Sequence, residues 1–70
     1  MDWTGCELVE VVPGKMSGAP VIKGTRVTPG TVVVNRELGE DEIAYQFRLP
    51  VYAVHSILEY WLAHQPALVR

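Results

Sequence analysis

The 70-residue sequence has one cysteine, little positive charge and no long apolar run. A single cysteine excludes an internal disulfide and fits a reducing compartment. We interpret Cys6 as a small buried hydrophobe, because no histidine lies near it in the sequence to activate the thiol. No stretch approaches the ~20 apolar residues of a membrane helix, and residues 1–4 lack the basic and apolar regions of a signal peptide. We therefore expect a cytoplasmic protein that does not bind membranes.

Positive charge is scarcest in the second half of the chain. Residues 1–35 carry three basic and three acidic side chains, whereas residues 36–70 carry three basic and five acidic ones. The formal net charge of −2 therefore belongs to the second half. This balance weakens any nonspecific attraction of that half to a phosphate backbone.

Apolar residues, by contrast, are abundant. They make up 49% of a chain whose length allows a single domain, residues 1–70. So small a domain buries a modest core, and a monomer would leave part of this apolar surface exposed. The surplus predicts a homodimer.

Residues 8–27 predict a β arm. Residues 8–12 are rich in β-branched side chains and residues 20–22 form a second short extended segment, with glycine-containing turns between and after them. Pro20 excludes a central ladder position, so we expect edge pairing or pairing across a dimer. We do not expect a sheet with its own core. The dimer interface is predicted to include Val21 and Ile22.

Residues 28–65 predict a helical bundle that begins with a helix over residues 28–38. Thr28 is a good N-cap that would accept a backbone N–H, and Pro29 suits the first helical position. Gly39 would end the helix in the left-handed conformation. The three valines at 32–34 have low helix propensity, so an extended conformation of residues 31–34 is the main alternative.

Residues 40–64 predict a helix-turn-helix. Three acidic residues open its first helix, over residues 40–47, where the helix dipole favours negative charge. Pro50 begins the second helix, which continues to about His64, before Pro66 stops it. Apolar residues recur in this helix at three- and four-residue spacing and predict one buried stripe: Val51, Val54, Ile57, Leu58, Trp61 and Leu62.

The helix-turn-helix prediction depends on where apolar and small residues stand. Ala44 supplies the small residue at the helix crossing, Leu49 fills the corner under the turn, and Arg48 occupies the turn position where glycine is common. The remaining core positions are Ile43, Phe47, Val54 and Ile57. We therefore predict a mainly α protein: a short N-terminal β arm and a three-helix bundle, homeodomain-like or winged-helix-like.

A DNA-binding protein of this class would place the start of its last helix in the major groove. The exposed candidates there are Tyr52, His55 and Ser56, and none is among the arginine, lysine, asparagine or glutamine side chains that contact purines bidentately. Glu59 would repel phosphates. The expected phosphate contacts are Lys15, Lys23, Arg26 and Arg48.

Several of these features have a simpler structural interpretation. Residues 23–26 form either a phosphate- or acid-binding arm or a tight turn whose charges are solvated or paired with Glu7 and Glu10. Trp61 and Leu62 form either a dimer seam or part of the core. Residues 40–42 complement the helix dipole, with a docking site for a basic partner as the alternative.

The sequence offers little for catalysis or metal binding. His55 and His64 lie nine residues apart on one helix, which does not suit a zinc site. A pair of Cys6 with a histidine has no orienting group in the sequence, and the spacing of a phosphate-binding loop is absent. We expect no enzymatic activity, no metal and no cofactor.

Two segments resemble a known family. Residues 12–28 contain a glycine, a small residue before Pro-Val-Ile, and the run Lys-Gly-Thr-Arg at 23–26. Residues 38–47 contain leucine-glycine, three acidic residues and Ile-Ala before a hydrophobic-centred turn. Both resemble the signatures of the bacterial family known as domain of unknown function 433, over about residues 8–64. The resemblance implies a β arm with a winged-helix-like or homeodomain-like bundle, usually dimeric, and no catalytic residues.

The same resemblance implies a function. The family resembles antitoxins of toxin–antitoxin pairs, whose genes often lie beside one for a PIN-like ribonuclease toxin. Only residues 65–70 follow the last predicted helix, so we expect any toxin contact to come from the folded part. We expect an antitoxin-like protein that binds a PIN-like toxin and its own operator DNA. The alternatives are a transcriptional regulator without a toxin and a protein-interaction module that does not bind DNA.

Overall fold

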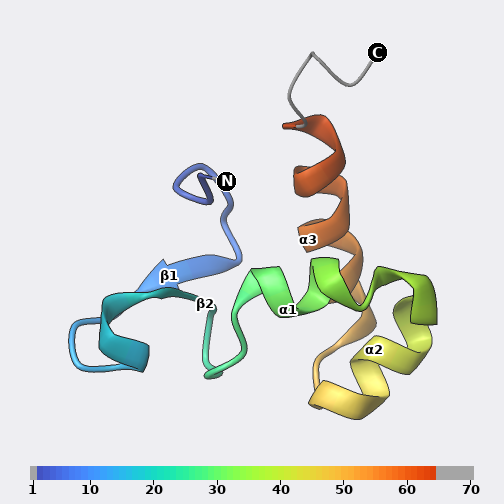
Figure 1. Cartoon of the computed structure of the whole chain (residues 1–70), viewed down its shortest axis with the longest axis horizontal. Helices are drawn as coiled ribbons and strands as arrows, with labels where there is room; N and C mark the ends of the chain where they lie inside the picture. The colour runs from blue at the N-terminus through green and yellow to red at the C-terminus, as the bar shows by residue number, and fades with distance from the viewer. Residues whose placement is uncertain (1, 65–70) are drawn as a thin grey trace.

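The computed structural model describes residues 2–64, which form a two-stranded hairpin followed by a helical bundle (Figure 1). This confirms the predicted mainly α architecture with an N-terminal β arm. No helix within residues 2–64 is long and apolar enough to cross a membrane. In chain order the elements are β1 (Val9–Val11), the short 3₁₀ turn η1 (Met16–Gly18), β2 (Pro20–Ile22), α1 (Pro29–Val34), the 3₁₀ turn η2 (Arg36–Leu38), α2 (Glu40–Phe47) and α3 (Val51–Ala63).

The hairpin pairs β1 with β2 in antiparallel register, with Val9 opposite Ile22 and Val11 opposite Pro20. Both strands are edges, so Pro20 is tolerated. As predicted, the hairpin has no core of its own, because it packs against the helices instead. Val21 and Ile22 are 0% and 3% exposed within a single chain. The prediction that these two side chains form a dimer interface is therefore wrong.

The α1 segment is helical, which decides against the extended alternative, but it is shorter than predicted. Residue 35 ends it: the Asn35 side chain donates to the Thr31 carbonyl over 2.8 Å, and a separate 3₁₀ turn follows. Short polar side chains compete in this way with regular helix bonds. Gly39 has positive φ but extended ψ (93°, 153°), so the predicted left-handed helix end is wrong.

The predicted N-cap of α1 is in the expected place, but its predicted hydrogen bond is wrong. Thr28 is the N-cap and has extended backbone angles, with Pro29 directly after it, as expected. Its side chain makes no capping bond. The Thr28 hydroxyl lies 2.9 Å from the Thr31 hydroxyl instead.

The helix-turn-helix positions behave as the sequence predicts. Ala44 and Leu49 are buried, and the Leu49 N–H donates to the Ala44 carbonyl over 2.9 Å. Arg48 adopts the left-handed conformation (φ 59°, ψ 44°) that glycine usually supplies in such turns. The other predicted core residues, Ile43, Val54 and Ile57, are fully buried, and Phe47 packs against them.

The buried stripe of α3 is shorter than predicted. Val51 and Leu62, near its two ends, are 44% and 60% exposed, so their assignment to the stripe is wrong. Ala53, in the first turn of α3, is buried instead, and α3 packs against both α1 and α2. Trp61 is half-buried, with the Arg36 guanidinium 4.8 Å from its ring centroid.

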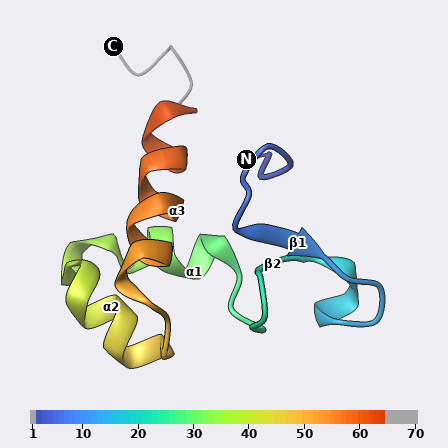
Figure 2. The same cartoon turned by 180° about the vertical axis from the view of Figure 1, so that it is seen from behind.

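An N-terminal segment completes the core. Trp3 and Cys6 are buried, which confirms the interpretation of Cys6 as a small core residue. The Trp3 ring stacks on Tyr60 of α3 at a centroid distance of 5.3 Å. The segment before β1 therefore lies beside the C-terminal half of α3, as both overall views show (Figures 1 and 2).

Candidate nucleic-acid interface

Two loops meet at one end of the molecule: the connection from β2 to α1 and the turn from α2 to α3 (Figures 1 and 2). Arg26 from the first loop and Phe47 from the end of α2 line the same shallow pocket, of about 230 Å³. Arg48 directly follows Phe47 in the chain. We call this region, defined by Arg26 and Arg48, the basic end.

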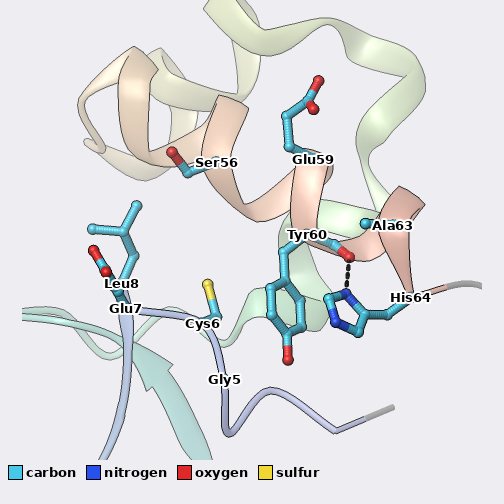
Figure 3. Close-up of a pocket in the computed structure, with 9 residues that line it drawn as sticks. All are labelled: Gly5, Cys6, Glu7, Leu8, Ser56, Glu59, Tyr60, Ala63 and His64. Carbon is cyan, nitrogen blue, oxygen red and sulfur yellow. Dashed lines mark hydrogen bonds between the residues drawn. The ribbon is translucent and has the colours of Figure 1, made fainter.

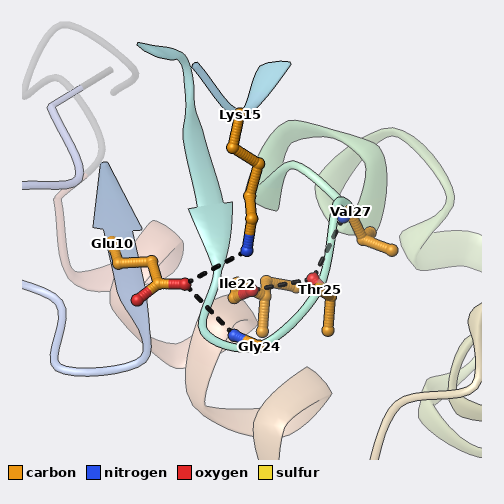
Figure 4. A network of polar contacts seen from close by, with 6 residues as sticks. All are labelled: Glu10, Lys15, Ile22, Gly24, Thr25 and Val27. Atoms are coloured by element: carbon orange, nitrogen blue, oxygen red, sulfur yellow. Dashed lines mark hydrogen bonds and ion pairs between the residues drawn. The ribbon is translucent and has the colours of Figure 1, made fainter. Parts of the chain in front are cut away.

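The first loop is a tight turn closed by hydrogen bonds (Figure 4). The Ile22 N–H donates to the Val27 carbonyl over 2.8 Å. The Thr25 hydroxyl donates to the Ile22 carbonyl over 2.7 Å and accepts the Val27 N–H over 3.0 Å. Gly24 has φ of +77°, which a residue with a side chain adopts at a cost. This turn exposes Lys23 and Arg26 on either side of Thr25.

Lys15 differs from the other basic candidates because it has a partner. Its Nζ lies 3.7 Å from Glu10 Oε2 of β1, and the same oxygen accepts the Gly24 N–H over 3.2 Å (Figure 4). Lys15 is therefore largely balanced before any ligand approaches. No carboxylate within residues 2–64 forms an ion pair with Lys23, Arg26 or Arg48. Three of the four predicted phosphate contacts thus keep free positive charge.

The three candidates on α3 do not form one surface. Tyr52 is exposed on the first turn, next to the basic end. His55 contacts the start of α2, where its Nδ1 lies 2.9 Å from Glu40 Oε2, and its Nε2 lies 3.7 Å from Glu59 Oε2. Ser56 is half-buried and faces the N-terminal segment.

The surroundings of His55 favour its protonated form. Its hydrogen bond to Glu40 and the negative charges of Glu40 and Glu59 raise the pKa of the imidazole above its ordinary value. The protonated ring would then satisfy two carboxylates from two helices. His55 is thus already engaged, and Tyr52 is the α3 candidate left open to a ligand.

The family comparison agrees with this architecture. A model described as a protein of unknown function, DUF433, matches residues 9–61. The chain belongs to the DUF433 family. The matched span runs from β1 into the last turns of α3, so it includes both loops of the basic end. No curated protein and no solved structure matches the chain.

One aromatic side chain close to Arg48, Tyr45, was not predicted as part of the site. In this DUF433 chain, Tyr45 is 82% exposed and lines a depression with Gln46 and Arg48. Gln46 has the chemistry to contact adenine, but its amide donates to Glu42 over 3.0 Å. Tyr45 lies on the polar face of α2, three residues before Arg48. An aromatic residue at that position could have indicated from the sequence that Tyr45 belongs to the site.

Proposed function

We propose that this DUF433 protein is an antitoxin-like regulator that binds its operator DNA through the basic end and holds a PIN-like toxin. One observation carries the DNA half: the unpaired cations flank the helix-turn-helix turn, where a DNA-binding protein of this class meets the duplex. Lys15 and Arg36 are already engaged elsewhere. The free positive charge of the described chain is therefore concentrated on one side.

This arrangement favours contact with phosphates over recognition of bases. Arg26 lines a pocket with Phe47, and Arg48 follows Phe47 in the chain. The exposed Tyr45 and Tyr52 are close to Arg48 in the chain. Guanidinium groups bind phosphate oxygens well, while tyrosines add hydroxyl or stacking contacts. The start of α3 presents no side chain suited to bidentate base contacts. We expect modest sequence preference and strong dependence on salt.

The test is fluorescence anisotropy with the duplex upstream of the protein's own gene, measured across salt concentrations. Log affinity should fall linearly with log salt. The double variant Arg26→Ala/Arg48→Ala should bind more weakly, with a slope smaller by about 2, because each phosphate contact contributes about 0.9. Lys15→Ala is the matched control, since Glu10 already balances that charge; its slope should change little. If the protein does not bind the duplex at low salt, the proposal that it binds operator DNA is refuted.

The protein-binding half is favoured by exposed apolar side chains. Val34 is 77% exposed and Leu62 60% exposed, on different helices. Contiguous exposed apolar patches are typical of surfaces that contact another protein, and these side chains are the candidates for such a patch. Co-expression with the product of the neighbouring gene, followed by purification, should give a stoichiometric complex. If DNA binding fails and the complex forms, the protein is an interaction module; if only DNA binds, it is a regulator without a toxin.

A further inference from the structure

A groove separates the N-terminal segment from the C-terminal half of α3 (Figure 3). Its volume is about 520 Å³, and it lies beside the C-terminal half of α3. Residues 5–8 form one side of the groove, and α3 and His64 form the other. We call this the N-terminal groove. Gly5–Leu8 lie before the span matched by the family model.

The wall of the N-terminal groove is fixed by aromatic stacking. Trp3 stacks on Tyr60, and Tyr60 stacks on His64 at a centroid distance of 3.9 Å. The Tyr60 hydroxyl donates to the Asp2 carbonyl over 3.1 Å. Gly5 passes so close that a Cβ there would lie 3.2 Å from that hydroxyl. These contacts hold the N-terminal segment at a set distance from α3, so the groove is a defined feature of the fold.

The lining combines negative charge with apolar surface. Glu7 comes from the N-terminal segment and Glu59 from α3, while the remaining side chains include Cys6, Leu8 and the Tyr60 ring (Figure 3). No lysine or arginine among residues 2–64 lines the groove. Glu7 has no ion pair within residues 2–64, and Glu59 has only His55 at 3.7 Å. Within residues 2–64, Glu7 therefore has no cation to balance it, and Glu59 has only the His55 ring, which it shares with Glu40.

We propose that the N-terminal groove docks an arginine or lysine side chain from an extended segment of a protein partner. Such side chains pair a cationic head with an aliphatic stem, which matches carboxylates beside apolar and aromatic surface. The proposal deepens the protein-binding half of the proposed function and rests on it. Nucleic acid does not suit this groove, because its phosphates would meet Glu7 and Glu59.

A second copy of the chain is a poorer occupant. Two unpaired cations of each copy, Arg26 and Arg48, lie at the basic end and do not line the groove. Insertion of one copy's basic end into the groove of the next would be a head-to-tail contact, which builds open assemblies unless the rotation closes. The charge pattern thus favours a basic segment of a different protein.

The test is an NMR titration of the full chain with a short capped peptide that contains leucine, arginine and alanine. A peptide with glutamate in place of arginine is its charge-reversed counterpart. The basic peptide should cause saturable shifts at the amides of Gly5–Leu8 and of residues 59–64, and the acidic one should not. Glu7→Gln/Glu59→Gln should weaken binding about fivefold to tenfold, as expected for two partly exposed ion pairs. Both side chains are exposed, so this variant should fold.

The matched control is Glu37→Gln/Asp41→Asn. It removes the same charge from exposed positions that do not line the groove, and it should leave peptide affinity within about twofold, since distant surface charges are screened. Three results would overturn the proposal. The basic peptide could cause no shifts, the acidic peptide could cause equal shifts, or the shifts could persist in Glu7→Gln/Glu59→Gln. If the peptide does not bind but the complex with the neighbouring gene product forms, only the assignment of the groove is wrong. If the peptide binds while neither DNA nor the complex does, the groove stands and the proposed function fails.

Discussion

At Arg48, the left-handed turn conformation conflicts with the side chain that the proposed DNA contact needs. With φ of 59°, Arg48 is one of two non-glycine residues within residues 2–64 that have positive φ; Ser17 is the other. A left-handed backbone costs a residue with a Cβ about 1 kcal/mol, and the exposed guanidinium makes no ion pair in the described chain that would offset this cost. An arginine at this position therefore lowers the stability of the fold, which is consistent with a role in binding.

Replacement of Arg48 by glycine should separate stability from binding. Arg48→Gly relieves the backbone strain, so the free energy of unfolding should rise by about 0.5–1 kcal/mol in urea denaturation. The same variant should bind DNA more weakly. Arg48→Ala is the matched control, because it removes the guanidinium and keeps the strain; its stability should stay near that of the parent. A parent more stable than Arg48→Gly would contradict the strain argument.

The contact between α2 and α3 contains a titratable link. His55 of α3 meets Glu40, the first residue of α2, over 2.9 Å, and Glu59 adds a second carboxylate from α3 itself. These groups raise the pKa of His55 in the folded state. A raised pKa means that the stabilisation is complete below the ordinary value of about 6.5 and is lost as pH rises through the folded-state pKa.

Stability should therefore fall as pH rises from about 6 to 8, measured as the thermal midpoint in low salt. Glu40→Gln should flatten this dependence, because it removes the hydrogen bond and the main charge acting on His55. Asp41→Asn removes the same charge from the same helix turn without a bond to His55, and it should keep the pH dependence. A profile in Glu40→Gln as steep as in the parent would show that the link contributes nothing.

At the scale of the whole molecule, apolar side chains remain on the surface. Leu62 is 60% exposed beside the half-buried Trp61, and Val34 and Leu38 are exposed on the α1–η2 segment. The prediction of a homodimer keeps its physical basis in these residues, although Val21 and Ile22 no longer belong to it. Trp61 is partly engaged within the chain, which leaves Leu62 as the better probe.

Sedimentation equilibrium should give a dimer mass at micromolar concentration, and Leu62→Glu should shift it to monomer, because a carboxylate cannot be buried in an apolar seam without a partner. The control is Tyr45→Glu, which places the same charge at an exposed position of α2. A monomer for the parent chain would refute the dimer. If both variants dissociate the dimer equally, Leu62 is not specifically part of the dimer interface.

Charge is also organised at this largest scale. The basic end carries Arg26 and Arg48, which form no ion pair within residues 2–64, whereas the N-terminal groove is lined by Glu7 and Glu59. A formal net charge of −2 does not reveal this separation. The two proposals use this separation: a polyanion would bind at the basic end and a basic protein segment in the groove.

The sequence by itself determined the elements and the helix-turn-helix core. The spacing of Ile43, Ala44, Val54 and Ile57 fixes which faces of α2 and α3 are buried, since a helix presents residues three and four apart on one side. Arg48 could be placed in the turn from its position alone. The end of α1 was predicted less well, because the side-chain bond of Asn35 competes with the continuing helix.

Only the tertiary structure decided what each surface contains. Lys15 is paired and Arg26 is not, because the hairpin brings Glu10 to one and the bundle brings Phe47 to the other. His55 meets Glu40 across fifteen residues through the crossing of two helices. Trp3 meets Tyr60 from the other end of the chain. Local patterns determine helices and turns through nearby backbone bonds, whereas contacts between distant residues depend on how those elements pack.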